Sequence, residues 1–467
     1  MLPANAQPRQ ALRPPPVAIA SAAAAADVKL YWEKAWMAAT ALTVILVIRL
    51  LEVYAPLAAL HPAVLGVFAS VSVLLVRTPG KAWNTALRDR QLRATLFYCV
   101  IICLNVPFGL WRGGSMPTVN ALPYLIALTV VMLLVQPKRQ DLDRLMNWTV
   151  IFGGVFAAYT ALIARTRFDV VGGARLSTYG SYDSNDLASM MSMLMLLAIG
   201  MAMRTRGRWR LAALGCLTIM FVVFVKTGSR GGVVAFALAT SVLLLGQNIR
   251  RFVVLVLALG IALPAAWTFG PRTFRVRTMS LFTIEQDYTY TSHQGRIEIW
   301  KRGLGYFAES PILGVGPNNF PVRDGAALTQ MGIPGSWLTA HNTYVQAMVE
   351  VGIFGIGGLL YMLYRAARDA LPLYRPRSRG PTKLHRPEIL AALISFATAA
   401  FFLSHAYSYL LFYAVGLCAL ARRVRAAEMA GATSALPRPV AQAPSRVLGR
   451  GRPAFRPRHA AIPPHRP

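Results

Sequence analysis

The stretch LTAHNTYVQAMVEVGIFG, residues 338–355, changes from polar to apolar at one point. His341 and Asn342 stand before the change, and mainly apolar residues follow to about residue 364. A run of this length can cross the ~30 Å hydrocarbon layer of a membrane as a helix. Asn342 or Thr343 can cap its first turn. The stretch therefore predicts a membrane helix with a histidine at its N-terminal end.

Similar apolar segments recur along the whole chain of 467 residues, of which 55% are hydrophobic and 14% charged. A soluble protein with a net charge of +31 would suggest nucleic acid, but the repeated segments indicate a lipid bilayer instead. We therefore predict an all-α polytopic membrane protein with about 12 transmembrane helices and no nucleic-acid partner. The predicted spans are 36–56, 59–76, 93–110, 120–136, 147–164, 186–203, 211–226, 231–248, 252–269, 342–364, 388–406 and 408–421.

The 49 lysines and arginines fall mainly on alternate linkers between these spans. Cytoplasmic loops of membrane proteins carry an excess of such residues, so the pattern predicts that both termini are cytoplasmic. The opposite side would be periplasmic if the membrane is the inner membrane of a Gram-negative bacterium. That side carries thirteen cations and one large periplasmic loop, residues 270–341.

The two ends of the chain differ in composition from the spans. Residues 1–35 are rich in proline and alanine and lack the apolar core of a signal peptide. Residues 426–467 are basic and of low complexity. We expect both to be disordered cytoplasmic tails on a membrane domain of residues 36–425. The four cysteines lie inside apolar segments without metal-ligand spacing, so no metal or cofactor is predicted.

Lys226 and Arg230 are two of the exterior cations, in the sequence VKTGSRGG. Ser229 is suited to cap the next span, which places Arg230 in the first turn of a helix that begins on the outer face. Free N–H groups at a helix start, together with a guanidinium, suit an anion such as a phosphate. The alternative is an arginine that extends to the lipid headgroups.

The exterior loop contains HQGRIEIWKRGLGYFAES, which ends before Pro311. Its apolar residues share one helical face: Ile297, Trp300, Leu304 and Phe307. The pattern predicts a short amphipathic helix at the membrane surface. Arg296 and Arg302 could then face a lipid-linked phosphate, or lipid headgroups in general.

His341 stands at another helix start on the predicted outer face. The positive end of the helix dipole disfavours an imidazolium there. A neutral imidazole can accept the proton of a hydroxyl, although a capping role is the common alternative. Glu350 lies two turns further in, where a carboxylate is either functional or paired with an internal polar group.

The sequences SRGG, GRIEIW with PILGVGPNNF, and HNTYVQAMVEVGIFG follow one another in this order. Together they resemble the O-antigen ligase/polymerase family, which includes lipopolysaccharide O-antigen ligases, polysaccharide polymerases and protein O-oligosaccharyltransferases. The resemblance covers about residues 180–360. YDSNDLA, residues 182–188 with Asn185, is similar to an asparagine-containing stretch of that family.

The resemblance implies a metal-independent, inverting glycosyltransferase that uses a glycan on undecaprenyl diphosphate as donor. Carried over to this sequence, Arg230 and Arg296 would hold the diphosphate, and His341 would act on the acceptor hydroxyl. The acceptor would be lipid A–core, a growing polysaccharide or a protein. Further substrate contacts are expected from Ser229, Asn342, Lys226, Arg302, Trp300 and Asn185.

A polysaccharide transporter or flippase is the alternative from another functional class. It would predict inverted repeats and several charges at the membrane midplane. The sequence shows no internal repeat, and charges within its spans are few. A transferase is therefore the favoured interpretation.

Overall fold

The computed structural model describes residues 31–52, 57, 59–163, 166–169, 173–178, 182–282, 295–333, 337–374 and 384–434. All of them belong to one unit, Met1–Ser434. The predicted N-terminal tail lies almost wholly outside the described residues, as do residues 435–467.

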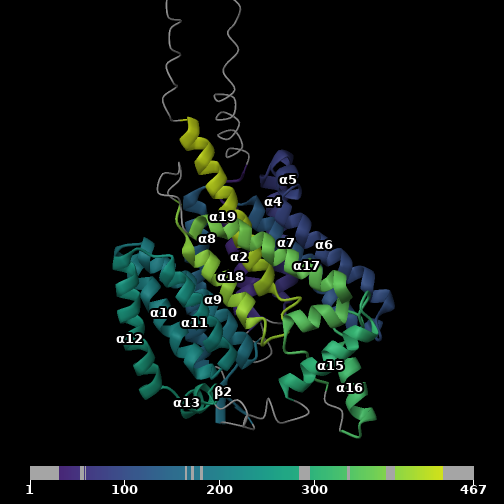
Figure 1. Cartoon of the computed structure of the whole chain (residues 1–467). Helices are drawn as coiled ribbons and strands as arrows, with labels where there is room; N and C mark the ends of the chain where they lie inside the picture. Colours follow the sequence, from purple (N-terminus) through teal and green to yellow (C-terminus); the bar gives the residue numbers. More distant parts are fainter. Residues whose placement is uncertain are drawn as a thin grey trace, which may run out of the picture. The chain divides into compact units, whose positions relative to one another are not determined.

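Each of the twelve predicted spans overlaps a helix (Figure 1). The first six are α2 (Ala35–Thr43, continued by the π-helix η1, Val44–Ile48), α4 (Pro62–Arg77), α6 (Arg90–Asn105), α7 (Arg112–Leu134), α8 (Arg139–Ile163) and α9 (Ser184–Arg204). The others are α10 (Gly207–Thr227), α11 (Arg230–Leu245), α12 (Ile249–Phe269), α17 (Thr343–Tyr374), α18 (Pro387–Ala399) and α19 (Tyr409–Ser434).

Seven of the described helices are long and apolar enough to cross a membrane: α6 with its 3-10 continuation, α7, α8, α9, α10, α12 and α17. Four further apolar helices are shorter, at 10–17 residues: α2 with η1, α4, α11 and α18. The chain is thus a helical membrane protein, as predicted. The number twelve and the side on which the long loop lies remain predictions.

Helix α9 lies at the centre of the helix packing. It contacts α8, α10, α11 and α18, and 83% of its apolar segment is buried. Its methionines and leucines supply much of that core, and their unbranched or flexible side chains fill irregular gaps. Helix α12, at the edge in Figure 1, has only 6% of its apolar segment buried, as expected of a helix that faces lipid.

Three details differ from the prediction. Helix α18 ends at Ala399 rather than near residue 406, so His405 lies in a loop. Helix α19 continues to Ser434, beyond the predicted domain end at 425, because its alanine-rich last turns favour helix and Arg139 pairs with Glu428. The all-α description also omits an antiparallel hairpin of β1 (Thr166–Asp169) and β2 (Gly173–Leu176).

The predicted exterior loop contains three helices: α13 (Arg272–Met279), α15 (Arg296–Glu309) and α16 (Phe320–Gln330). Helix α15 confirms the helix predicted from the GRIEIW pattern, and it ends before Pro311 because proline cannot continue a helix. It packs against α16 and α17. The remaining short elements are α5 (Gly80–Leu87), η2 (Leu50–Glu52) and η3 (Val106–Phe108).

Helix α17 is broken at Gly352, where φ is 69° and ψ is −162°. The turn after α15 enters this break through three backbone hydrogen bonds: Val315 N to Val349 O (2.9 Å), Gly316 N to Glu350 O (2.9 Å) and Ile353 N to Pro311 O (2.8 Å). A Cβ atom at Gly352 would lie 2.1 Å from the carbonyl oxygen of Ile312. Glycine is therefore required both for the backbone angles and for the close approach.

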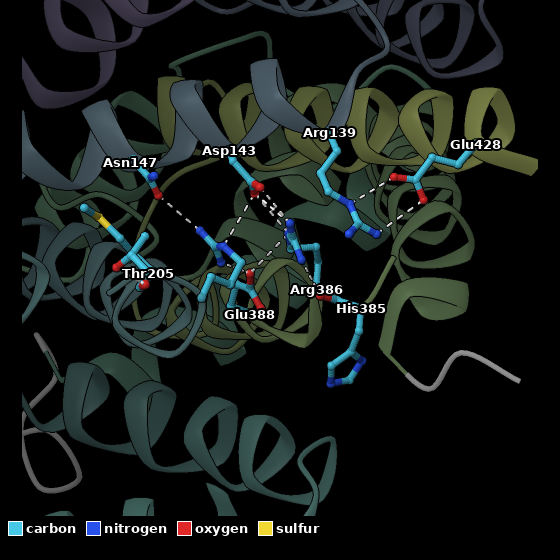
Figure 2. A network of polar contacts seen from close by, with 10 residues as sticks. Arg139, Asp143, Asn147, Thr205, His385, Arg386, Glu388 and Glu428 are labelled. Carbon is cyan, nitrogen blue, oxygen red and sulfur yellow. Dashed lines mark hydrogen bonds and ion pairs between the residues drawn. The ribbon is translucent and has the colours of Figure 1, made fainter. Parts of the chain in front are cut away.

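A network of ion pairs joins α8, α18 and the C-terminal end of α9 (Figure 2). Arg386 binds both oxygens of Asp143 at 2.8 and 2.9 Å, and Arg204 pairs with Glu388 and Asp143. Two arginines and two carboxylates balance in charge here. Buried charges are costly unless they are paired, so this network is best explained as a set of contacts that holds the three helices together.

Candidate functional site

The site begins at the N-terminal end of α9, about 30 Å along the helix from the network of Figure 2. Asp183 caps this helix by accepting hydrogen bonds from the backbone N–H groups of Asn185 (2.6 Å) and Asp186 (2.8 Å). The cap fixes the first turn. It therefore fixes the side chains of Asn185 and Asp186, which the turn presents at the predicted exterior end.

Asn185 joins three segments at this end. Its side-chain oxygen accepts hydrogen bonds from Arg175 Nη2 (2.8 Å) and from Ser229 Oγ (3.0 Å). Arg175 also donates from Nε to the carbonyl oxygen of Thr227 at 2.9 Å. The hairpin and the starts of α9 and α11 are thus held against one another.

Ser229 is the predicted cap of α11, and the structure confirms this role. Its Oγ accepts a hydrogen bond from Gly232 N at 3.3 Å. Arg230 lies in the first turn, as expected, and its Nη1 donates to Ser280 Oγ at 2.9 Å, just beyond α13. Arg230 therefore stands where the free N–H groups of the α11 start favour an anion.

Arg296, at the start of α15, has no hydrogen-bond partner in the described part of the chain, although it is partly buried. Burial and the positive charge of Arg230 lower the pKa of Arg296 to about 10. Arg175 and Arg277 act in the same direction, whereas Asp183 opposes them. We call these four residues the arginine cluster: Arg175, Arg230, Arg277 and Arg296.

His341 lies beside this cluster in a left-handed backbone conformation, with φ of 46°. Burial and the charge of Arg296 lower the pKa of His341 to about 4, and the charge of Asp186 opposes the shift. Trp300 donates from its indole N–H to the carbonyl oxygen of Ala340 at 3.0 Å, so α15 positions the residue just before His341. A histidine with so low a pKa carries a neutral imidazole at physiological pH, which is the form that can accept a proton.

Asp186 and His405 are joined by a hydrogen bond, with 2.8 Å between Oδ1 and Nε2. The charge of Asp186 acts on His341, so a carboxylate that the sequence did not single out lies near that histidine. His405 was missed because residue 405 was assigned to a span. The loop that carries it is held by a 2.9 Å bond from His405 N to Thr343 Oγ1.

The structure also shows the surroundings of four further candidate positions, Asn342, Arg302, Lys226 and Glu350. Asn342 caps α17 by accepting from Tyr344 N (2.9 Å) and Val345 N (3.1 Å), so its oxygen is engaged. Arg302 forms two hydrogen bonds with Asp324, at 2.7 and 2.9 Å, which join α15 to α16. Lys226 is exposed in the last turn of α10.

Glu350 is the fourth of these positions, and it is paired internally. Its carboxylate accepts hydrogen bonds from Asn318 N (2.9 Å), Phe320 N (3.2 Å), Tyr407 Oη (2.8 Å) and Gln346 Nε2 (3.3 Å). It therefore holds the turn before α16. This role is the structural alternative considered for an intramembrane carboxylate.

The arginine cluster brings several guanidinium groups together. The charges of Arg230, Arg175 and Arg277 lower the pKa of Arg296, whereas the charge of Asp183 raises it. Guanidinium groups gathered next to a helix start can bind a phosphate or diphosphate. Arg175 and Arg277 are among the thirteen cations predicted to lie on the exterior side. Their position on that side is the sequence signal that could have identified them. Within the described ranges, no three His, Cys, Asp or Glu side chains are grouped as a metal site would need.

Residues 215–360 match a family model described as O-antigen ligase. The match confirms the family resemblance and includes Arg230, Arg296 and His341, but not Arg175, Asp186 or His405. No curated protein matches the chain.

Proposed function

We propose that the chain is a membrane glycosyltransferase that moves a glycan from undecaprenyl diphosphate to a hydroxyl group of an acceptor. The observation that carries this proposal is the arginine cluster beside His341, in which Arg296 has no hydrogen-bond partner within the described ranges. The family match supports it, because the matched segment bears Arg230, Arg296 and His341. The charge distribution along the chain supports a reaction at the periplasmic face of the inner membrane.

In this reaction the acceptor oxygen attacks the anomeric carbon of the donor sugar. The bond between that carbon and the phosphate oxygen breaks, and the diphosphate leaves with the electron pair. Negative charge therefore grows on the diphosphate, where the guanidinium groups of Arg230 and Arg296 can stabilise it. Attack from the face opposite the leaving group inverts the configuration.

The acceptor proton goes to His341 as the new bond forms. A neutral imidazole is the form that can receive it, and the site keeps His341 neutral by burial and by the charge of Arg296. When the diphosphate binds, its negative charge offsets that of Arg296. The basicity of His341 therefore rises once the donor is in place.

The acceptor is proposed to be lipid A–core or a growing polysaccharide. A protein hydroxyl would require the same attack and the same proton transfer, so the site chemistry is shared. The three acceptor classes are distinguished by the product. The assay therefore offers each of them separately to the purified protein with one lipid-linked donor.

The test compares wild type with Arg230→Ala, Arg296→Ala and His341→Ala in that assay. We expect each variant to lose transfer by about 10²-fold or more. Lys301→Ala is the matched control, because Lys301 lies on the same helix as Arg296 and its exposed ammonium pairs with Glu298. The Lys301→Ala variant should transfer the glycan at the wild-type rate. Full transfer by folded Arg296→Ala and His341→Ala would overturn the proposal.

A further inference from the structure

The pair Asp186–His405 lies outside the segment that the family model matches, and the reaction described above does not use it. Asp186 belongs to the first turn of α9, and His405 to the loop between α18 and α19. Two titratable groups from distant parts of the sequence thus meet next to His341. Helix packing alone does not require two titratable side chains at this point.

The orientation of the pair follows from its chemistry. A carboxylate only accepts hydrogen bonds, so the 2.8 Å contact requires the proton to be on Nε2 of His405. His405 Nδ1 is buried and has no partner among the residues that the structure describes. The ring also stacks on Phe396, with 6.2 Å between ring centroids and 19° between planes. His405 is therefore fixed, and it presents one N–H to Asp186.

Asp186 has an oxygen left for another partner. Its Oδ1 binds His405, whereas no hydrogen bond to Oδ2 occurs within the described ranges. The side chain keeps 30% of its accessible surface, so this oxygen can be reached from the site. A carboxylate held by one oxygen and open at the other is suited to act on a neighbouring cation.

The segment that carries His405 is bonded to the segment that carries His341. Thr343, two residues after His341, donates from Oγ1 to Leu403 O at 2.7 Å and accepts from His405 N at 2.9 Å. Thr343 N also donates to Ala400 O at 2.8 Å. These bonds fix the distance between the two histidine-bearing segments.

We propose that Asp186 and His405 act as a positioning pair for His341. When His341 takes the acceptor proton, the carboxylate of Asp186 stabilises the resulting imidazolium, and His405 keeps that carboxylate in place. No bond to Asp186 or His405 is made or broken, and the proton stays on His341 until the diphosphate or water removes it. The inference rests on the proposed transferase function.

The charged groups around His341 come from several elements. Arg296 of α15 faces it with a positive charge, and Asp186 of α9 with a negative one. Asp183 lies next to Asp186, and Arg230, Arg175 and Arg277 act on Arg296. Loss of Asp186 removes the negative charge that raises the pKa of His341, so the basicity of His341 must fall.

The test uses the full-length protein and the variants Asp186→Asn and His405→Gln. For Asp186→Asn we expect kcat to fall on the order of tenfold or more, and the acid limb of the kcat–pH profile to move to lower pH. Histidine NMR of the substrate-free variant should show a lowered His341 pKa. Glutamine keeps an N–H for Asp186, so His405→Gln should lose less activity than His405→Ala.

Glu309→Gln is the matched control. It removes a carboxylate at the end of α15, where Glu309 pairs with Arg323, and it should leave the acid limb in place. An unchanged kcat and pH profile in Asp186→Asn, with His341→Ala inactive, would overturn the pairing and leave the transferase intact. Activity in His341→Ala would instead overturn the transferase proposal itself.

Discussion

Ser229 donates a 3.0 Å hydrogen bond to the side-chain oxygen of Asn185, and this bond joins the starts of α11 and α9. The same oxygen accepts a hydrogen bond from Arg175 Nη2 at 2.8 Å. A neutral amide therefore positions one arginine of the cluster beside the starts of these two helices.

The first prediction concerns Asn185→Asp. The new carboxylate would pair with Arg175 and repel a diphosphate, so donor affinity should fall by about tenfold or more. Binding is measured with the lipid-linked donor by calorimetry or fluorescence. Asn147→Asp makes the same change beside Arg204, at the other end of α9, and should leave donor affinity unchanged. Equal affinities for the two variants would contradict the prediction.

The second prediction separates two arginines of α15. Arg302→Ala leaves the Asp324 carboxylate, whose side chain is fully buried, without its main partner. We expect a loss of stability of about 3 kcal/mol, seen as a lower Tm in detergent. Donor binding by the folded fraction should persist. Arg296→Ala should show the reverse, with weak donor binding and little change in Tm.

The third prediction concerns the titration of His341. Its pKa is lowered to about 4, so the unfolded chain binds more protons between pH 4 and 6.5. Stability should therefore fall as the pH is lowered through this window. His341→Gln should reduce that dependence, measured as Tm against pH. Arg296→Gln should raise the His341 pKa in histidine NMR, whereas Lys301→Gln should not.

The fourth prediction concerns the break in α17. Gly352→Ala places a methyl group 2.1 Å from Ile312 O at a φ of 69°, so the turn must leave the break. We expect a lower Tm and loss of transfer together. Gly357→Ala is the control on the same helix, since no atom lies within 4 Å of its added Cβ. That variant should match wild type in both measurements.

The sequence predicted every long helix because each span carries its own signal, the length and continuity of an apolar run. The ends of the helices were predicted less accurately than their presence. The end of α18 at Ala399 was missed because residues 400–403 are also apolar or small, and hydropathy does not register the hydrogen bond that their backbone makes with Thr343. Because the predicted span extended to residue 406, His405 was assigned to a helix rather than to a loop.

The site was only partly predictable for a related reason. Arg230, Arg296 and His341 stood out as polar residues beside apolar runs or in matching motifs. Arg302 stood out equally well, and only its pairing with Asp324, 22 residues later, shows a structural role. Asp186 gave no signal because its partner His405 is 219 residues away. Pairing across such distances leaves no local pattern.

The backbone bonds between the 311–316 turn and the break in α17 tie the folding of the turn to that of the helix. Two of the turn's N–H groups, on Val315 and Gly316, find their acceptors on Val349 and Glu350 of α17. A soluble fragment that ends before α17 would leave both groups without those acceptors. The turn and the helix are therefore expected to fold together.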